Sequence, residues 1–327
     1  MNDKWPNAFA GVHCETTATG TLLKNIGVDL SEPMLFGLSQ GLGFIYWNMK
    51  IMDFPFIGGR IKPDLITKNI TEILNLNLNI KQTTSIKKAW KNIEEPLSQK
   101  IPVGLKLDCY HLEYFKNKIH FAAHYVATTG LDEEFAYLVD TIQQGQCVKT
   151  SLKSLELARN EKGPMSSKNL SYTIESSGSI PPIQNVLPIA IIQNAKDFLN
   201  PPIKNIGYKG ILKTSQEIKK WFKTSTNRHR DFTTTAMLME KAGTGGSLFR
   251  NIYRDFLKEA QAYIENRALV QAHDSYSEIS KSWKEVAELF NEAGETENIV
   301  HINAASKLLV AISEKEKETM ELLLTVG

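Results

Sequence analysis

The stretch HFAAHYVATTGLDEEFAYLVD, residues 120–140, contains two runs of β-branched and aromatic residues with a short polar segment between them. The segment Gly130–Glu133 has the composition of a hairpin turn. Runs of this kind on both sides of a turn indicate two antiparallel strands. The sequence therefore predicts a β-hairpin with strands over residues 119–129 and 134–141.

This predicted hairpin brings two ionisable side chains together. If the pairing is centred on Asp132, His124 lies directly opposite Asp140, with Cβ atoms roughly 4.5–5.5 Å apart. The carboxylate can then accept a hydrogen bond from the imidazole, fix its tautomer and stabilise its protonated form. A slip of one residue would bring Val139 or Thr141 opposite His124 instead. The alternative interpretation is a hydrogen-bonded core histidine without a chemical role.

The residues around the hairpin predict an α+β domain. Helical patterns precede it, and further strand patterns lie on both sides of it. The expected helices cover residues 14–26, 32–38, 64–76 and 86–93, and the other expected strands cover 101–108 and 169–175. Helices followed by antiparallel strands are typical of the α+β class.

The second half of the chain predicts a helical bundle. A Ser-, Gly- and Pro-rich segment at residues 163–188 is typical of a linker. Beyond it, apolar residues recur at steps of three and four, over 209–222, 247–264, 269–292 and 299–324. We therefore predict two domains, residues 1–180 and 181–327. The amphipathic helices of the second domain can bind a carrier protein, cover a site or form a homo-oligomer.

Composition excludes several classes of function. The chain has 327 residues with 38 basic and 36 acidic side chains, and this balance lacks the basic excess of a nucleic-acid-binding protein. No stretch approaches the roughly 18 unbroken apolar residues of a membrane span, and the N-terminus lacks the core of a signal peptide. Its 3 cysteines are too few and too far apart for a disulfide framework or a zinc site. We expect a reduced, cytoplasmic protein that binds neither nucleic acid nor membranes.

The segment Gly11–Glu15 places Cys14 in the first turn of a predicted helix. Peptide dipoles and unpaired amides at a helix N-terminus favour thiolate, the form of cysteine that attacks a carbonyl carbon. The backbone amide of Cys14 can also donate to the oxyanion formed by that attack. The alternative is a small buried side chain, because free cysteine is among the most buried residue types.

Other residues compete for these roles. Under strand alternation His120 would share the face of His124. Cys109 and His111 form a second cysteine–histidine pair on one predicted strand. We favour Cys14 as the nucleophile, because Cys109 follows an apolar run and has no helix terminus beside it.

Taken together, these motifs resemble a known superfamily. A helix that begins at cysteine, followed by a strand with His124 and a second strand ending in Asp140, is similar to the papain-like cysteine peptidases. Four segments are more specifically similar to the BtrH-like N-terminal domain of butirosin-biosynthesis acyltransferases: residues 11–17, 32–37, 41–44 and 58–60. The similarity covers about the first 175 residues, and the helical remainder resembles the domain of unknown role that often follows.

The resemblance implies an acyltransferase that moves an acyl group from a carrier-protein thioester to a small amine through an acyl-cysteine intermediate. Cys14 would be the nucleophile, His124 the base and Asp140 its orienting residue. The donor partner is then an acyl carrier protein, whose phosphopantetheine arm holds the thioester. We expect no bound cofactor and no metal ion in the protein itself.

The sequence departs from the papain-like pattern before the nucleophile. Those peptidases usually place an oxyanion-donating glutamine six residues earlier, where this chain has Ala8. The oxyanion candidates are therefore the side chain of Asn7 and the backbone amide of Cys14. The departure favours transfer from a thioester, because thiolate leaves more readily than an amine. A cysteine peptidase or amidase with the same three residues, and a non-catalytic papain-like binding protein, are the alternatives.

Glycine clusters provide candidates for substrate contacts. Gly41, Gly43 and Gly59 can hold the backbone close to a bound acyl chain, although such glycines often only form turns. His13 and Arg60 are the other pocket candidates. In the second half, Gly243–Ser247 precedes a helix with Arg250 and Arg254, and this combination can bind a phosphate group. We favour an interhelical loop capped by Ser247.

Overall fold

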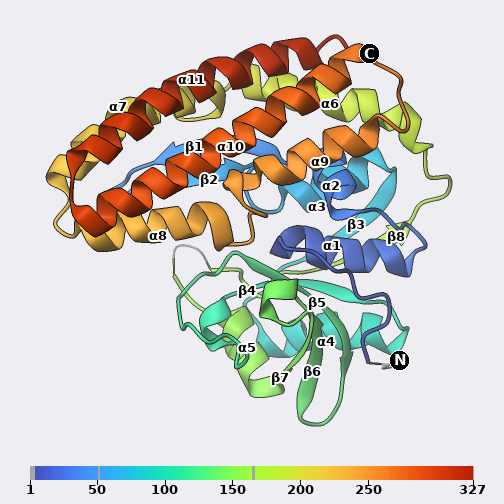
Figure 1. The fold of residues 1–327 in the computed structure, drawn as a ribbon. Helices are drawn as coiled ribbons and strands as arrows, with labels where there is room; N and C mark the ends of the chain where they lie inside the picture. The colour runs from blue at the N-terminus through green and yellow to red at the C-terminus, as the bar shows by residue number, and fades with distance from the viewer. Residues whose placement is uncertain (1–3, 51, 164–165, 327) are drawn as a thin grey trace. The chain divides into compact units, whose positions relative to one another are not determined.

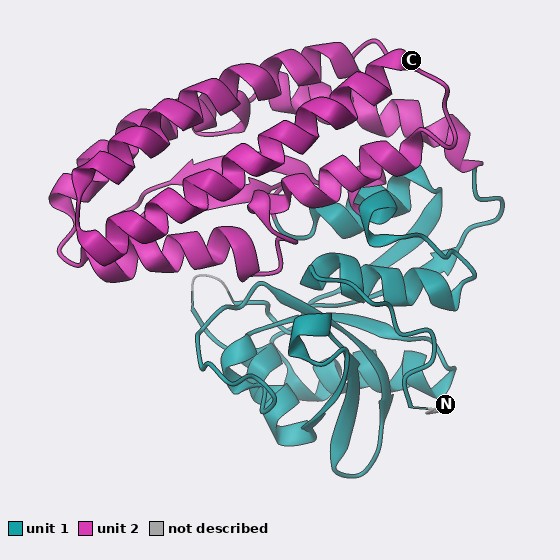
Figure 2. Cartoon of the chain, viewed as in Figure 1, with its two compact units in different colours: residues 1–35, 63–181 teal, residues 36–62, 182–327 magenta. Residues whose placement is uncertain are grey.

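The structure is a computed structural model that describes residues 4–50, 52–163 and 166–326. The chain forms two compact units, one made of residues 1–35 and 63–181 and the other of 36–62 and 182–327 (Figure 2). The predicted boundary after residue 180 lies beside the division at 181. The prediction was wrong for residues 36–62, which it assigned to the first domain and which belong to the second unit.

The elements are labelled in chain order (Figure 1). The first part of the chain contains α1 (Cys14–Asn25), α2 (Glu32–Leu38), β1 (Leu42–Trp47), β2 (Phe56–Arg60), α3 (Leu65–Ile73), β3 (Leu76–Lys81) and α4 (Ile86–Ser98). The next part contains β4 (Val103–Leu107), η1 (Cys109–His111), β5 (His124–Leu131), β6 (Phe135–Val139), η2 (Ile142–Gln144), β7 (Cys147–Ser151), α5 (Leu152–Asn160) and β8 (Ser171–Ser176). The remainder is helical, with α6 (Ile183–Leu199), α7 (Gly207–Thr224), α8 (Arg228–Lys241), η3 (Ser247–Phe249), α9 (Arg250–Ala260), α10 (Arg267–Thr296) and α11 (Ile299–Leu323).

The first unit is built on a 6-stranded antiparallel sheet in the order β3-β8-β4-β5-β6-β7. Apolar side chains of the middle strands pack with α4 and α5 in a core that includes Ile93, Leu105, Val126, Leu138 and Leu155. Helix α1 packs against β4, β5, β6 and β8. These features confirm the predicted α+β class and place the helix that begins at Cys14 against the strands of the hairpin.

The register of the hairpin differs from the prediction. Ala127 pairs with Val139, so paired residue numbers sum to 266 along this part of the ladder rather than to 264. The turn lies later in the chain than expected, because the Asp132 carboxylate accepts hydrogen bonds from the backbone N–H groups of Glu134 and Phe135. The predicted register, with the histidine directly opposite the aspartate, was therefore wrong.

Several element boundaries also differ from the prediction. Strand β5 begins only at His124, so His120 lies in the preceding loop and does not share a strand face with it. The predicted linker at residues 163–188 contains β8 and the start of α6. Its prolines did not indicate a long linker, because Pro182 is the N-cap of α6, where a proline removes no helical hydrogen bond.

The second unit joins the six C-terminal α-helices to the 2-stranded sheet of β1 and β2. Helix α10 packs against α8, α9 and α11, and α11 also packs against α6 and α7. The side-chain amide of Asn194 on α6 donates to the backbone oxygens of Gln40 and Leu42, and Ile45 forms a β-bridge with Ile206. These bonds explain why residues 36–62 fold with the helices. No helix in the described part of the chain is long and apolar enough to cross a membrane.

A fully buried ion pair joins α9 to α11. Arg250 donates from Nε and Nη2 to the two carboxylate oxygens of Glu316 at 2.8 and 2.9 Å, and from Nη1 to the backbone oxygen of Leu248 at 2.8 Å. Trp283 donates to the same carboxylate at 2.7 Å. Because the guanidinium nitrogens of Arg250 are already hydrogen-bonded to Glu316 and Leu248, Arg250 cannot bind a phosphate at the Gly243–Ser247 loop.

The ion pair leads to a stability prediction. We expect Arg250→Met to lower the free energy of unfolding by roughly 3–5 kcal/mol, because it leaves the Glu316 carboxylate buried without its cation. The double variant Arg250→Met/Glu316→Leu should recover much of that loss. The exposed pair of Lys284 and Glu288 is the control, and Lys284→Met should change stability by less than about 1 kcal/mol. Urea unfolding measures all three; equal losses for the two single variants would contradict the prediction.

Candidate active site

Cys14 is the first residue of α1, as predicted, and His13 is the N-cap with an extended backbone. The helix is polar in sequence yet buried along most of its length. Two of its threonine hydroxyls bond to the backbone of the helix and its N-cap: Thr17 donates to the backbone oxygen of His13 and Thr21 to that of Thr17. Cys14 itself keeps 9% of its surface exposed, so the residue retains some access to solvent.

The carboxylate of Glu32 holds the turn that precedes α1. It accepts hydrogen bonds from the backbone N–H groups of Val12 at 2.8 Å and His13 at 2.9 Å, and from the Thr16 hydroxyl at 2.6 Å. A Cβ atom at Gly11 would lie 2.9 Å from Glu32 Oε1, so the close approach depends on glycine. Burial raises the pKa of Glu32, although these hydrogen bonds oppose the shift. This supporting role of Glu32 could not be predicted from sequence patterns, because only the folded chain brings Glu32 to the turn.

His124 lies between Asp140 and Cys14. Its Nε2 atom is 2.8 Å from Asp140 Oδ2, which leaves Nδ1 as the ring nitrogen for the Cys14 sulfur, with which the imidazole also interacts. Burial lowers the pKa of His124, but the Asp140 carboxylate and the Cys14 sulfur together raise it well above its usual value. The structure thus brings the three predicted side chains together and favours a protonated imidazole next to the sulfur.

A β-bulge places His124 and Asp140 on the same face of the sheet. The register shifts between Thr128 and Gly130, so paired numbers sum to 267 near the turn and to 266 beyond the bulge. A shift of one residue exchanges the two faces of a strand. If the register beyond the bulge is extended, His124 lies opposite Ile142. Asp140 is then the diagonal neighbour of His124 on the same face, a separation that long side chains can span. Without the bulge the two side chains would point to opposite faces.

Asp140 is fixed by further hydrogen bonds. Its Oδ1 atom accepts the backbone N–H of Thr141 at 2.6 Å, and Oδ2 accepts the Tyr114 hydroxyl at 2.8 Å. Burial and then the neighbouring carboxylate raise the pKa of Tyr114 well above its usual value, so this hydroxyl remains a donor. Phe115 packs edge-on against the His124 ring, with ring centroids 5.2 Å apart. Sequence patterns do not indicate Tyr114 or Phe115 as site residues, because their loop has no periodicity.

The pKa of His124 leads to a pH prediction. Because its folded pKa lies above the unfolded value of about 6.5, the stability it contributes is fully present below that pH and is lost as the pH rises through the folded pKa. Asp140→Asn removes the charge that causes much of the shift, so the difference in unfolding free energy between about pH 6 and pH 9 should shrink. Asp132→Asn is the control, because the pKa of Asp132 lies at about 2, outside this range. Equal pH dependence in the Asp140 variant and the unsubstituted chain, measured by urea unfolding, would contradict the assignment.

The prediction that Asn7 donates to an oxyanion was wrong. Its side-chain amide contacts Asn25 Oδ1 at 3.5 Å, and Asn25 is the last residue of α1, whereas Cys14 is the first. At 1.5 Å per residue the two ends of the helix are about 16 Å apart. The backbone N–H of Phe9 also bonds to Thr21, so this segment runs back alongside the helix. The backbone amide of Cys14 remains the oxyanion candidate, since first-turn amides have no acceptor within the helix.

The predicted pocket residues are divided between the units. His13 is buried next to Cys14. The other four lie in the second unit, on and beside β1 and β2: Gly41, Gly43, Gly59 and Arg60. Packing alone explains why residue 59 is glycine, because a Cβ atom at Gly59 would lie 2.2 Å from the backbone oxygen of Leu248. A role of these residues in binding substrate stays a prediction.

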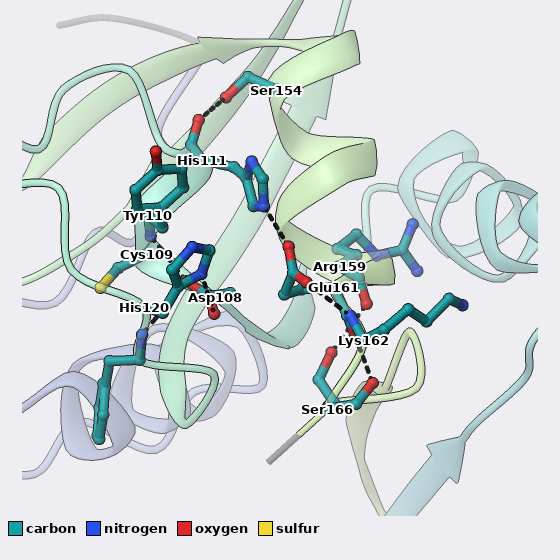
Figure 3. A network of polar contacts seen from close by, with 12 residues as sticks. Asp108, Cys109, Tyr110, His111, His120, Ser154, Arg159, Glu161, Lys162 and Ser166 are labelled. Carbon is teal, nitrogen blue, oxygen red and sulfur yellow. Dashed lines mark hydrogen bonds and ion pairs between the residues drawn. The ribbon is translucent and has the colours of Figure 1, made fainter. Parts of the chain in front are cut away.

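The rival cysteine–histidine pair does not form. Cys109 is buried and its thiol donates to the backbone oxygen of Ile119 at 3.3 Å. Burial raises the pKa of Cys109, which keeps it in the unreactive thiol form. His111 instead contacts Glu161, with 2.5 Å between Nε2 and Oε2 (Figure 3).

Two family models match the chain. Residues 13–141 match the family described as butirosin biosynthesis protein H, N-terminal, and residues 153–323 match the domain of unknown function DUF4872. No curated protein matches the chain. The matched segments cross the structural units, since β8 lies in the second match but in the first unit. The chain therefore belongs to the DUF4872 family and has a BtrH-type N-terminal domain in front of that domain.

Proposed function

We propose that this protein is a biosynthetic acyltransferase that moves an acyl group from a carrier-protein thioester to a small amine through an acyl-cysteine at Cys14. One observation carries the proposal: the imidazole of His124 interacts with both Asp140 and Cys14, at the N-terminus of α1. The match to the BtrH N-terminal family supports it. We also propose a papain-like fold for the first unit, because α1 begins at the proposed nucleophile and packs on an antiparallel sheet, as in papain-like enzymes.

In the first step, the Cys14 thiolate attacks the thioester carbonyl. The oxyanion that forms accepts hydrogen bonds from first-turn amides of α1, including that of Cys14. The bond between the carbonyl carbon and the phosphopantetheine sulfur then breaks. The His124 imidazolium gives its proton to that departing sulfur, which leaves an acyl-Cys14 and a neutral imidazole.

In the second step, the acceptor amine attacks the acyl-Cys14 carbonyl. The neutral imidazole of His124 accepts the proton that the amine loses as the amide bond forms. Asp140 stabilises the imidazolium that results, and Cys14 leaves as thiolate. The second step therefore restores the starting charges of all three side chains.

Product analysis tests the proposal. The chain is mixed with an acyl-loaded carrier protein, with and without a panel of small amines, and the products are identified by mass spectrometry. Formation of an amide that depends on the chain supports the acyltransferase. Free acid as the only product, at equal rates with and without amines, would identify a hydrolase with the same three residues. An unchanged thioester in every mixture would contradict both reactions.

A further inference from the structure

Three side chains that can ligate a metal ion lie close together outside the proposed active site. His111 ends η1, His120 lies in the loop before β5, and Glu161 directly follows α5. One ligand atom from each of them lies within 4.8 Å of those of the other two (Figure 3). The proposed acyl transfer uses none of these three residues.

The side chains of His111 and Glu161 are hydrogen-bonded to each other. The 2.5 Å separation between His111 Nε2 and Glu161 Oε2 is that of a short hydrogen bond. An imidazole nitrogen and a carboxylate oxygen that converge on one proton can also converge on one metal ion, which releases the proton. The backbone N–H of Lys162 donates to the other oxygen of Glu161, Oε1, at 2.9 Å, so both carboxylate oxygens have a hydrogen-bond partner.

In metal-ligating histidines, the ring nitrogen that does not bind the metal usually donates to a carboxylate, and His120 has such a partner. The side chain of Asp108 is almost fully buried, and its Oδ2 atom lies 3.3 Å from His120 Nδ1, which leaves Nε2 for a ligand bond. Backbone N–H groups of Tyr110 and Phe121 fix the Asp108 carboxylate at 2.8 and 3.3 Å. The Tyr110 ring stacks on the imidazole, with centroids 3.9 Å apart and planes 10° apart. His120 is therefore fixed even though much of its side chain is exposed.

We propose that His111, His120 and Glu161 form a binding site for a divalent transition metal, with zinc as the best-fitting ion. Two imidazole nitrogens and one carboxylate oxygen are a typical zinc ligand set, and the fourth position is left to water. Calcium and magnesium fit poorly, because they prefer oxygen ligands. The ion would join the loop that leads into β5 to the end of α5. The wide spacing of the three residues along the chain explains why the sequence predicted no metal.

Calorimetric titration of zinc chloride into the full-length chain, after dialysis against a chelator, tests the site. We expect one zinc ion per chain, and affinity at least about tenfold lower in His120→Ala and in Glu161→Gln. His229→Ala is the matched control, because His229 also lies near one carboxylate and is 61% exposed, against 58% for His120. Zinc should also raise the unfolding temperature of the unsubstituted chain and of His229→Ala, but not that of His120→Ala.

Cys14 and His124 are also chemically able to bind zinc, so Cys14→Ala is titrated in parallel. Full retention of zinc binding in Cys14→Ala, with loss in His120→Ala, supports the proposed site. Loss in Cys14→Ala with retention in His120→Ala would place the ion at the catalytic pair and overturn the proposal. Absence of binding in the unsubstituted chain would overturn it too. The titration does not depend on acyl transfer, so its result is separate from that of the proposed function.

Discussion

Replacing Cys14 with alanine is expected to abolish acyl transfer while leaving the thermal unfolding of the chain almost unchanged. The substitution removes one sulfur atom and keeps the helix. The other cysteines lack the setting of Cys14: the Cys109 thiol is buried and bonded to a backbone oxygen, and Cys147 begins strand β7 rather than a helix. Loss of the nucleophile in enzymes with a triad lowers the rate by more than about a thousandfold, and we expect a loss of that size here.

The matched variant for this prediction is Cys147→Ala. It also removes one thiol, but from an exposed position on β7, and should transfer acyl groups at the unsubstituted rate. The transfer rate of Asp140→Asn should lie between those of Cys14→Ala and Cys147→Ala, because the nucleophile and base remain while the orienting charge is lost. Amide formation, followed by mass spectrometry at a fixed donor concentration, gives all three rates. Transfer by Cys14→Ala at more than a small fraction of the normal rate would exclude an acyl-cysteine intermediate.

A chain that ends at residue 152, close to the end of the BtrH-type match, is expected not to fold. Strand β8 lies between β3 and β4, and among the described strands β3 pairs with β8 alone. Its loss also removes Tyr172 and Ile174 from the core, where each buried side chain contributes roughly 1.5–3 kcal/mol. The free energy of unfolding of a typical domain is about 5–15 kcal/mol. These losses, together with the loss of strand pairing, are large enough to unfold the shortened chain.

A chain that ends at residue 181 is the control, because it keeps α5 and β8. Both shortened chains lack the helices that pack on residues 36–62, so the difference between them isolates the contribution of residues 153–181. Circular dichroism should show a cooperative thermal transition only in the longer of the two. A cooperative transition in the chain that ends at residue 152 would show that the sheet does not need β8.

The parts of the site that were predictable from sequence depend on local patterns. The start of α1 at Cys14 follows from helical periodicity after a glycine-containing segment. The association of His124 with Asp140 was predicted with the wrong register. The true register differs by two residues on that part of the ladder, and an even shift keeps both side chains on one face. The prediction therefore identified the pair correctly but not the geometry.

The features that the sequence did not reveal depend on contacts between distant segments. The bulge near Thr129 lies beside Gly130, which was predicted to belong to the turn, and its effect on the two faces appears only when the strands pair. Asn7 was assigned by its nearness to Cys14 in sequence, whereas the chain runs back along α1 before the helix begins. Glu32 and Tyr114 act through hydrogen bonds to segments far away in sequence. Residues 36–62 resemble the N-terminal family, yet their hydrogen-bonding partners come from α6 and the segment after it.

Identifying the residue that carries the acyl group decides whether Cys14 is the nucleophile. The chain is mixed with an acyl-loaded carrier protein in the absence of any amine, quenched in acid, digested and mapped by mass spectrometry. We predict one acyl group per chain, on the peptide that contains Cys14, and its absence from Cys14→Ala. An acyl group found only on other residues, or none on a chain that still forms amide when an amine is added, would exclude an acyl-Cys14 intermediate.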